Sequence, residues 1–298
     1  MNFSQLQCFV ALAEMGSFTE ASYAVNMTQS AVSHALAALE SELGVTLLER
    51  NRKGVVALTS TGQRIMPHVR ELLAQAEAIE QEAKAAHGVA EGKLRVGSIL
   101  SLCPGLLASV LTRFQQQYPE IDVVLFEGTM VEVHEWIGNS IIDVGFVVHP
   151  AKGMESKRIA SDELCAIVPL NHRLNAYDAV PPHELNEEDF VMAKAGCSFQ
   201  LMEMAGIDIS KARPRLRYQA TDSATILAMV REGLGITVQP RMLLPQKLEG
   251  VVALPLDPPQ QLEIGLAVKS QEKASPAARL FVQQTMAWTQ EPQLSLAH

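Results

Sequence analysis

The sequence predicts a mixed fold class, in which a helical N-terminal domain and one long helix precede an alternating α/β domain. Three observations predict it. Residues 1–62 combine amphipathic helical segments with a short basic hairpin. Residues 65–86 repeat apolar side chains at spacings of four and three, and strands alternate with helices from residue 93 onward. We therefore expect domains at 1–62 and 89–298, joined by a linker helix over 63–88.

Two short helices are expected at the start of the chain. The first should end at Gly16, because glycine readily takes the left-handed conformation that ends helices. The second is expected over 19–25, started by Ser17 and followed by a turn at 26–27. The apolar face of the first helix, which should be buried, consists of Phe3, Leu6, Phe9, Val10 and Ala13.

The third helix is expected to have two faces with different roles. Thr28 is a suitable N-cap and Gly44 a suitable end. An apolar stripe at helical spacing should be buried, and it consists of Val32, Leu36, Leu39 and Leu43. Small and polar residues lie on the other side, namely Ser30, Ser33, His34 and Ala37. A helix with one buried face and one small polar face is suited to the major groove of DNA.

A basic hairpin follows the third helix. Two short strands on either side of Arg52-Lys53-Gly54 would form a wing. From Arg50 to Arg64 there are four basic residues and no acidic one, although the whole chain has a net charge of −9. A local basic cluster of this kind is typical of phosphate contact, and the order of elements is that of a winged helix-turn-helix. A buried helical hairpin inside an enzyme is the alternative, which the charged wing disfavours.

These elements resemble the N-terminal signature of LysR-type transcriptional regulators over the first 65 residues. The resemblance is carried by GSFTEAS (16–22), TQSAVSHALAALESELG (28–44), LLER (47–50), and Leu58-Thr59 leading to Gly62. Ser22 stands where the family usually has alanine, and Leu48 where phenylalanine is commoner. The resemblance implies a bacterial, sequence-specific DNA-binding regulator and not an enzyme. The DNA-contact candidates are Ser17, Thr19, Thr28, Gln29, Ser30, Ser33, His34, Arg50, Arg52 and Lys53.

The linker helix has the spacing of a coiled-coil seam. Its seam residues are Ile65, Val69, Leu72, Ala76, Ile79, Ala83 and Ala86. Pairing with a second copy explains such a seam better than a monomeric surface helix does. Pro67 is expected in a first turn or at a slight kink, and residues 88–92 read as a hinge. The resemblance implies that this helix forms a dimer, and that a dimer of dimers is the full assembly.

Residues 93–298 alternate strands with helices, which predicts parallel sheets. The resemblance implies two α/β subdomains joined by crossover strands, as in periplasmic binding proteins, with an effector bound between them. The first subdomain would comprise about 93–162 and 268–298, and the second about 163–267. Effector binding would change subdomain closure and thereby the spacing of the DNA-reading helices, which requires different ligand affinity in the two states.

Hydroxyl groups that follow strands, close to helix starts, are the effector-site candidates, because free backbone N–H groups there favour anions. The effector-contact candidates are Ser98, Leu100, Ser101, Thr129, Phe146, His149, Ser198, Phe199, Thr221 and Asp222. The alternative is that Ser98, Ser198 and Asp222 are ordinary helix caps. A small carboxylate with an apolar body would fit this set, although no arginine clamp is evident.

Other classes of protein find little support. There is no GxSxG, GxGxxG, HExxH or P-loop lysine, and no metal-like cysteine or histidine spacing, so no cofactor is expected. The longest uncharged run, 96–112, contains a proline and two glycines, and no signal peptide precedes Phe3, so a cytoplasmic protein is expected. The expected partners are an interrupted-palindrome operator in double-stranded DNA, a small effector, further copies of the chain and RNA polymerase.

Two alternative functions remain open. One is a small-molecule binding protein whose N-terminal domain only dimerises. The other is a redox sensor, because Cys197 follows Ala195-Gly196 as the reactive cysteine does in the peroxide-sensing branch of the family. No second cysteine occurs in 198–210 to resolve an oxidised Cys197, which disfavours this role. The four cysteines are otherwise expected to be buried small hydrophobic residues.

Overall fold

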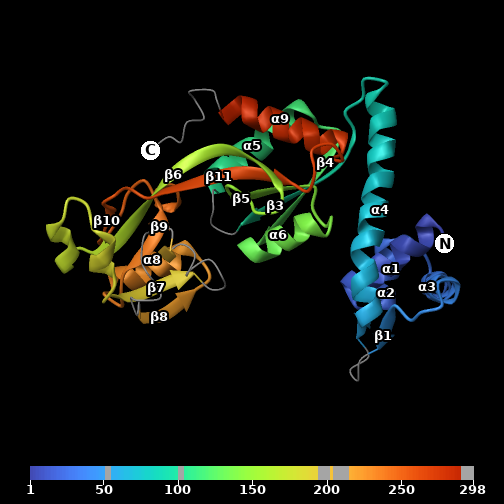
Figure 1. Cartoon of the computed structure of the whole chain (residues 1–298), viewed down its shortest axis with the longest axis horizontal. Coiled ribbons are helices and arrows are strands. Elements are labelled where there is room, and N and C mark those ends of the chain that lie inside the picture. Colours follow the sequence, from blue (N-terminus) through green and yellow to red (C-terminus); the bar gives the residue numbers. More distant parts are fainter. Residues whose placement is uncertain (51–54, 100–103, 194–201, 204–214, 290–298) are drawn as a thin grey trace. The chain divides into compact units, whose positions relative to one another are not determined.

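The computed structural model describes residues 1–50, 55–99, 104–193, 202–203 and 215–289. The chain forms two compact units, the first built on Met1–Val89 and the second starting at Ala90 (Figure 1). None of the helices within the described ranges is long and apolar enough to cross a membrane. Each unit is described below by itself.

The three N-terminal helices form as the sequence predicts. They are α1 (Phe3–Met15), α2 (Phe18–Ala24) and α3 (Gln29–Leu43). The side chains of their N-cap residues, Asn2, Ser17 and Thr28, each accept a backbone N–H from the first turn. Gly16 and Gly44 end α1 and α3 in the left-handed conformation, with φ of 63° and 68°. Local capping therefore determines these boundaries.

The buried core of the first unit joins all three helices to the wing and to the start of α4 (Ser60–Ala85). Val32, Leu36 and Leu39 are buried as expected. Two residues of the expected buried faces are exposed, Phe3 by 54% and Leu43 by 40%. Each lies in a terminal turn of its helix, beyond the region that the neighbouring helices cover.

Two strands form the wing, β1 (Leu48–Arg50) and β2 (Val56–Leu58). They pair antiparallel, with Leu48 opposite Leu58 and Arg50 opposite Val56. Residues 51–54 between them lie outside the described part of the chain. The strands and the three helices together confirm the winged helix-turn-helix.

The long helix α4 begins five residues before the first predicted seam residue, with Thr59 as its N-cap. Pro67 therefore lies in the helix interior and not in its first turn. The first part of the seam packs against the core of the N-terminal unit, where Val69 is buried. Further along, Leu72 is 38% exposed and Ile79 is 71% exposed, so this part of the seam remains uncovered within one chain.

The second unit is built on a seven-stranded sheet in the order β10-β6-β11-β5-β3-β4, with β9 also paired to β6. Its strands are β3 (Gly92–Ile99), β4 (Ile121–Gly128), β5 (Val144–Val148), β6 (Glu155–Pro169), β9 (Thr237–Pro240), β10 (Val251–Pro255) and β11 (Gln261–Val268). Figure 1 shows α5 (Pro104–Gln117) and α9 (Pro276–Thr289) on one face and α6 (Met130–Gly138) on the other.

The expectation of parallel sheets is only partly correct. β4, β3 and β5 are parallel, whereas β11 lies antiparallel between β5 and β6. β9 and β10 are also antiparallel to β6. The simple alternation of strands and helices misses this arrangement, because a strand from the end of the chain inserts between two earlier ones.

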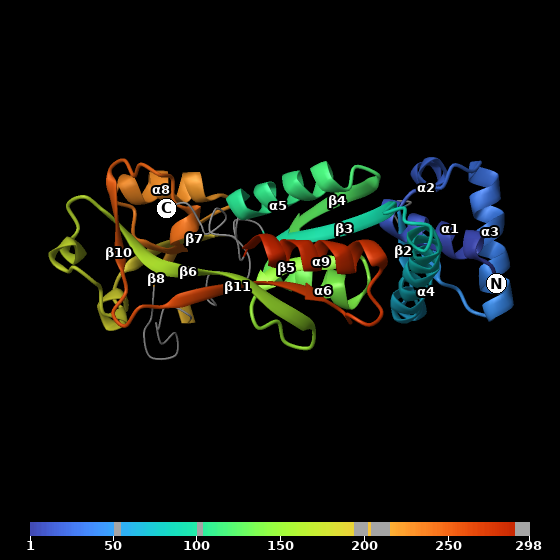
Figure 2. The same ribbon diagram turned by 90° about the horizontal axis from the view of Figure 1, so that it is seen from above.

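β6 and β11 run side by side along the second unit (Figures 1 and 2). Residues 155–163 of β6 pair with β11, and its later residues pair with β9 and β10, so one strand serves both halves. In the second half, β7 (Asp189–Ala193) pairs in parallel with β8 (Arg215–Ala220), and α8 (Ser223–Arg231) packs on β6 and β7. This confirms the crossover-strand architecture. Ser198, which the sequence also offers as a helix cap, lies outside the described residues.

Candidate functional site

The exposed face of α3 is the main candidate site. Gln29, Ser30, Ser33 and His34 are all exposed, whereas Val32 on the same helix is buried. Among the described residues, no hydrogen-bond partner is found for the side chains of Gln29, Ser33 and His34. These three side chains can therefore donate or accept hydrogen bonds to an external partner.

Thr28 and Ser30 are already partly engaged at the start of α3. The Thr28 hydroxyl oxygen accepts the N–H of Ala31 at 3.2 Å and lies 3.1 Å from the Ser30 hydroxyl. This local network fixes the first turn of α3, which is where the side chains closest to base edges would lie. The main role of Thr28 is thus to cap α3, and its hydroxyl has limited capacity for a further hydrogen bond to DNA.

The start of α2 contains the candidates Ser17 and Thr19. Ser17 caps α2 by accepting the N–H of Glu20 at 3.4 Å, while the side chain of Thr19 is exposed. The unusual Ser22 is buried and donates its hydroxyl to the Thr19 carbonyl at 2.7 Å. This intrahelical hydrogen bond explains how a serine is tolerated at a position where alanine would be expected.

The wing is held to α3 by a residue that the sequence pattern did not identify. One carboxylate oxygen of Glu40 accepts the N–H groups of Leu47 and Leu48, at 2.7 and 3.2 Å. Its spacing from Leu36 places it at the edge of the buried stripe, and this signal could have identified it. Arg50 belongs to β1, whereas Arg52 and Lys53 lie outside the described residues.

Thr59 and Gly62 hold the other end of the wing to α4. The Thr59 hydroxyl donates to the Thr46 and Leu47 carbonyls and accepts the N–H of Gly62 at 3.0 Å. Gly62 lies so close to the backbone that an added Cβ would be 2.1 Å from the Leu47 oxygen. The Gly16 carbonyl, at the end of α1, accepts the N–H of Val56. These contacts place the wing and α3 in one rigid frame.

The effector candidates at β3 and β4 lie close to one edge of the sheet. Ile99 pairs with Gly128, so Ser98 and Thr129 belong to neighbouring strand ends. Ser98 is buried inside β3 instead of following it, because β3 extends to Ile99. Thr129 follows β4 and accepts the N–H of Glu132 at 3.2 Å. Its own N–H and hydroxyl lower the pKa of the Glu132 carboxyl.

The candidates at α8 favour the capping alternative. Asp222 is the N-cap of α8 and accepts both the N–H and the hydroxyl of Thr225, at 2.9 and 2.8 Å. These hydrogen bonds, the backbone one first, lower the pKa of the Asp222 carboxyl. Thr221 beside it is exposed. The carboxylate of Asp222 therefore caps α8, which is the alternative that the sequence analysis gave for this residue.

The remaining effector candidates have mixed outcomes. Phe146 was expected to line the wall of the site, but it is fully buried and makes an edge-to-face contact with Phe281 of α9. It is a core residue because its side chain points to the face of the sheet that α9 covers. His149 is half-buried, with Nδ1 3.0 Å from the Ser156 hydroxyl. Leu100, Ser101, Ser198 and Phe199 lie outside the described residues.

Two of the four cysteines fall within the described residues, and both are buried free thiols. Burial raises the pKa of Cys8, and it raises that of Cys165 to about 11. Both are therefore poor nucleophiles at neutral pH. Cys103 and Cys197 lie outside the described residues.

We expect Cys165 to be alkylated by iodoacetamide at pH 8 at least about 100-fold more slowly in the native chain than in urea. With a pKa of about 11, roughly one thiol in a thousand is ionised at pH 8, against about a quarter at the ordinary pKa. Mass spectrometry of the Cys165 peptide measures both rates. The pKa of Cys165 is higher in the folded chain than in the unfolded one. The free energy of unfolding is therefore undiminished below the unfolded pKa, and it falls as the pH rises from the unfolded pKa toward the folded value of about 11. Equal native and denatured rates would contradict the burial.

Two family models match the chain. The model described as "Bacterial regulatory helix-turn-helix protein, lysR family" matches residues 3–63, and "LysR substrate binding domain" matches residues 87–290. The HTH-type transcriptional regulator YvbU of Bacillus subtilis is 35% identical over 288 residues, covering 95% of this chain and 97% of that protein. The transcriptional dual regulator GltC of the same species is 28% identical over 289 residues, covering 94% and 95%.

Solved structures share the fold along almost the whole chain. A full-length OxyR variant from Pseudomonas aeruginosa has a TM-score of 0.75 at 21% identity, covering 97% of both chains. Full-length CbnR in complex with its target DNA has a TM-score of 0.61 at 21% identity, covering 97% of this chain and 100% of that one. At this identity the likeness concerns the fold alone.

Proposed function

The chain belongs to the LysR family of bacterial helix-turn-helix transcriptional regulators, and we propose that α3 and the wing bind operator DNA under the control of a small effector bound in the second unit. The exposed polar face of α3 is the observation that carries the DNA-binding proposal. Its side chains are polar and are held on a capped helix, and those of Gln29, Ser33 and His34 have free hydrogen-bonding capacity among the described residues. A helix with these properties can enter a major groove without steric hindrance.

Base contacts and phosphate contacts are assigned to different residues. Gln29, Ser33 and His34, together with Ser30, are the base-contact candidates, because they project from the first half of α3. Arg50, Arg52 and Lys53 would contact phosphates, with Ser17, Thr19 and Thr28 as further candidates near the backbone. A dimer would place two α3 helices in successive major grooves of an interrupted palindrome.

The proposed effector site lies between the two subdomains of the second unit. Ser98 and Thr129 support it from one side, because they lie at neighbouring strand ends. Thr221 and Asp222 support it from the other, at the start of α8. Phe146 is withdrawn from the proposed site. Five further residues are kept in it on the sequence argument alone, namely Leu100, Ser101, His149, Ser198 and Phe199. A small carboxylate with an apolar body is the proposed effector class.

The proposed organisation is a DNA-binding domain at 1–62, a dimerisation helix at 63–88 and an effector domain at 89–298. The uncovered Leu72 and Ile79 on α4 support pairing with a second copy. A dimer of dimers is the proposed assembly. Contact with RNA polymerase is proposed for the DNA-bound state.

Replacing Ser33 or Gln29 by alanine is expected to reduce sequence discrimination by about 1–3 kcal/mol, because each good base contact contributes that much. Ser41→Ala is the matched control, since Ser41 is an exposed serine at the other end of α3. Fluorescence anisotropy with the upstream intergenic DNA and a scrambled duplex, at two salt concentrations, measures both affinities. Arg52→Ala should instead weaken binding to both duplexes equally and reduce the salt slope by about one.

Similar behaviour of Ser33→Ala and Ser41→Ala would contradict the assignment of base contacts to the first half of α3. Equal, salt-sensitive binding of the unmodified chain to both duplexes would contradict sequence-specific recognition of that DNA. It would favour the alternative in which the N-terminal unit only dimerises.

A further inference from the structure

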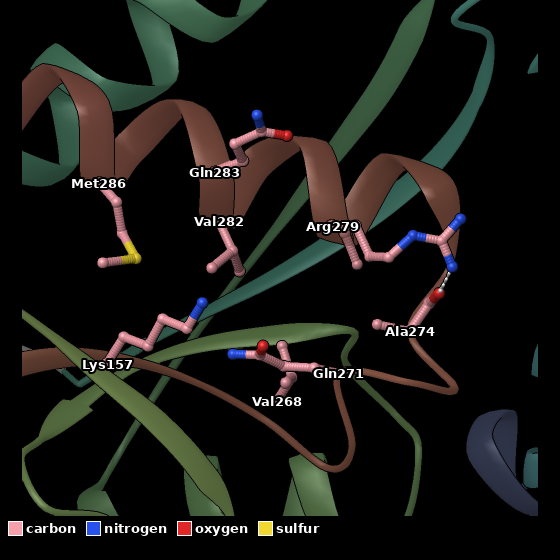
Figure 3. A pocket seen from close by; sticks show the side chains of 9 residues that line it. Lys157, Val268, Gln271, Ala274, Arg279, Val282, Gln283 and Met286 are labelled. Atoms are coloured by element: carbon pink, nitrogen blue, oxygen red, sulfur yellow. Dashed lines mark hydrogen bonds between the residues drawn. The ribbon is translucent and has the colours of Figure 1, made fainter.

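A cavity of about 290 Å³ lies in the second unit between α9 and the strands β6 and β11 (Figure 3). Its walls come from the beginning of β6, the end of β11, the following loop and one face of α9. None of its lining residues belongs to the effector site proposed above. A cavity of about 150 Å³ can hold benzene, so this one has room for a ring with a polar substituent.

Most of the cavity wall is apolar and firmly packed. Val268 at the end of β11, together with Ala278 and Val282 of α9, is buried. Val282 and Met286 point from α9 toward the strands in Figure 3. Such a wall favours an apolar body, because burial of apolar surface is the main favourable contribution to small-ligand binding.

One cationic side chain is directed into this apolar space. Lys157 of β6 is an exposed residue at the open side of the cavity, and its Nζ points toward the region beneath Val282 (Figure 3). Within the described part of the chain, Lys157 has neither an ion-pair nor a hydrogen-bond partner. The next residue, Arg158, differs in this respect, because it forms a 3.0 Å ion pair with Glu263 on β11. Adjacent residues of a strand face opposite sides, so of these two residues Lys157 is the one that presents its charge to the cavity.

Three further polar residues border the cavity, and the amide of one of them, Gln283, points away from the strands in Figure 3. The Gln271 side chain points into the cavity, and its amide can donate or accept a hydrogen bond (Figure 3). Arg279 donates from Nη1 to the Ala274 carbonyl at 2.9 Å, so its guanidinium is held at one end of the cavity. The Arg279 guanidinium is thus partly engaged, whereas Lys157 is the cation to which the ligand is assigned, with Gln271 as its neighbouring polar group.

We propose that this cavity is a second ligand site, which binds a small monocarboxylate with an apolar body. The carboxylate engages the Lys157 ammonium and the Gln271 amide, and the apolar body packs against Val282 and Met286. A charge-assisted hydrogen bond in a partly apolar site is stronger than a neutral one, so the anion is preferred over an uncharged analogue. β6 extends from this cavity into the sheet of the other subdomain.

The test uses the full-length chain and the probe 4-fluorobenzoate, followed by fluorine NMR titration. The uncharged 4-fluorobenzamide is the matched ligand control. We expect saturable binding of the carboxylate, weakened at least about tenfold for the amide and in Lys157→Met. Lys152→Met is the protein control, because Lys152 is an exposed lysine outside the cavity, and it should leave binding unchanged. Val282→Trp should fill the cavity and abolish binding.

Thermal unfolding in the presence of the probe keeps the test independent of folding defects. The probe should raise the Tm of the unmodified chain and of Lys152→Met, but not that of Lys157→Met. No saturable binding, or equal binding of acid and amide, would overturn the proposal. Binding that is lost in Thr221→Val and retained in Lys157→Met would also overturn it, because the probe would then occupy the effector site proposed above. The proposal that α3 binds DNA does not depend on any of these outcomes.

Discussion

Gly62→Ala is expected to destabilise the N-terminal unit by about 3 kcal/mol or more. An added Cβ would lie 2.1 Å from the Leu47 oxygen, and backbone atoms cannot move aside as a flexible side chain can. The same shift would lengthen the hydrogen bonds from Thr59 to residues 46 and 47. Hydrogen exchange of the intact chain should show lost protection in peptides from residues 1–62, together with weakened binding to DNA.

Gly105→Ala is the matched control for this variant. Gly105 also lies in the first turn of a helix, α5, but an added Cβ there meets no described atom within 4 Å. We expect it to be neutral or stabilising by up to about 1 kcal/mol, because alanine restricts the unfolded chain. Unchanged protection of residues 1–62 in Gly62→Ala would show that α4 can separate from the wing without loss of stability.

Glu40→Ala is expected to destabilise the wing by about 2–3 kcal/mol, since it leaves two part-buried N–H groups without their charged acceptor. The bonds to Leu47 and Leu48 are the direct connection between α3 and the first strand of the wing. The higher helix propensity of alanine offsets only a few tenths of a kcal/mol. Urea unfolding and hydrogen exchange of residues 45–59 measure the effect.

Two variants separate this role from the general loss of a surface charge. Glu40→Gln retains an acceptor oxygen and should recover part of the stability. Glu20→Ala removes an exposed carboxylate from α2 and should change stability by less than about 0.5 kcal/mol. Equal effects of Glu40→Ala and Glu20→Ala would show that the hydrogen bonds to the wing contribute nothing.

The fold of the N-terminal unit could be predicted closely because its signals are local. A cap, an apolar period and a terminating glycine lie within a few residues of one another, so α1, α2 and α3 could be located without tertiary information. The apolar spacing also predicted burial of Phe3 and Leu43, which are exposed in the structure. Spacing along one helix does not show where a neighbouring helix ends. Glu40 was missed for a related reason, since its partners are on the wing.

The effector domain was less predictable because its sheet joins distant segments. Phe146 could not be recognised as a core residue before Phe281, 135 positions later, was placed against it. Ser98 was expected after β3, but the strand extends past it to pair with β4 as far as Gly128. Thr129 and Asp222 retain their positions at helix starts, and their hydrogen bonds show capping as their structural role.

The sequence by itself determined the helix-turn-helix, the polar face of α3 and the long helix, because short-range spacing and capping specify each of them. Only the tertiary structure decided the insertion of β11 between β5 and β6, which places Glu263 beside Arg158 and leaves Lys157 facing the cavity beneath α9. Pairing between strands about a hundred residues apart depends on the packing of the whole unit, and no local pattern records it.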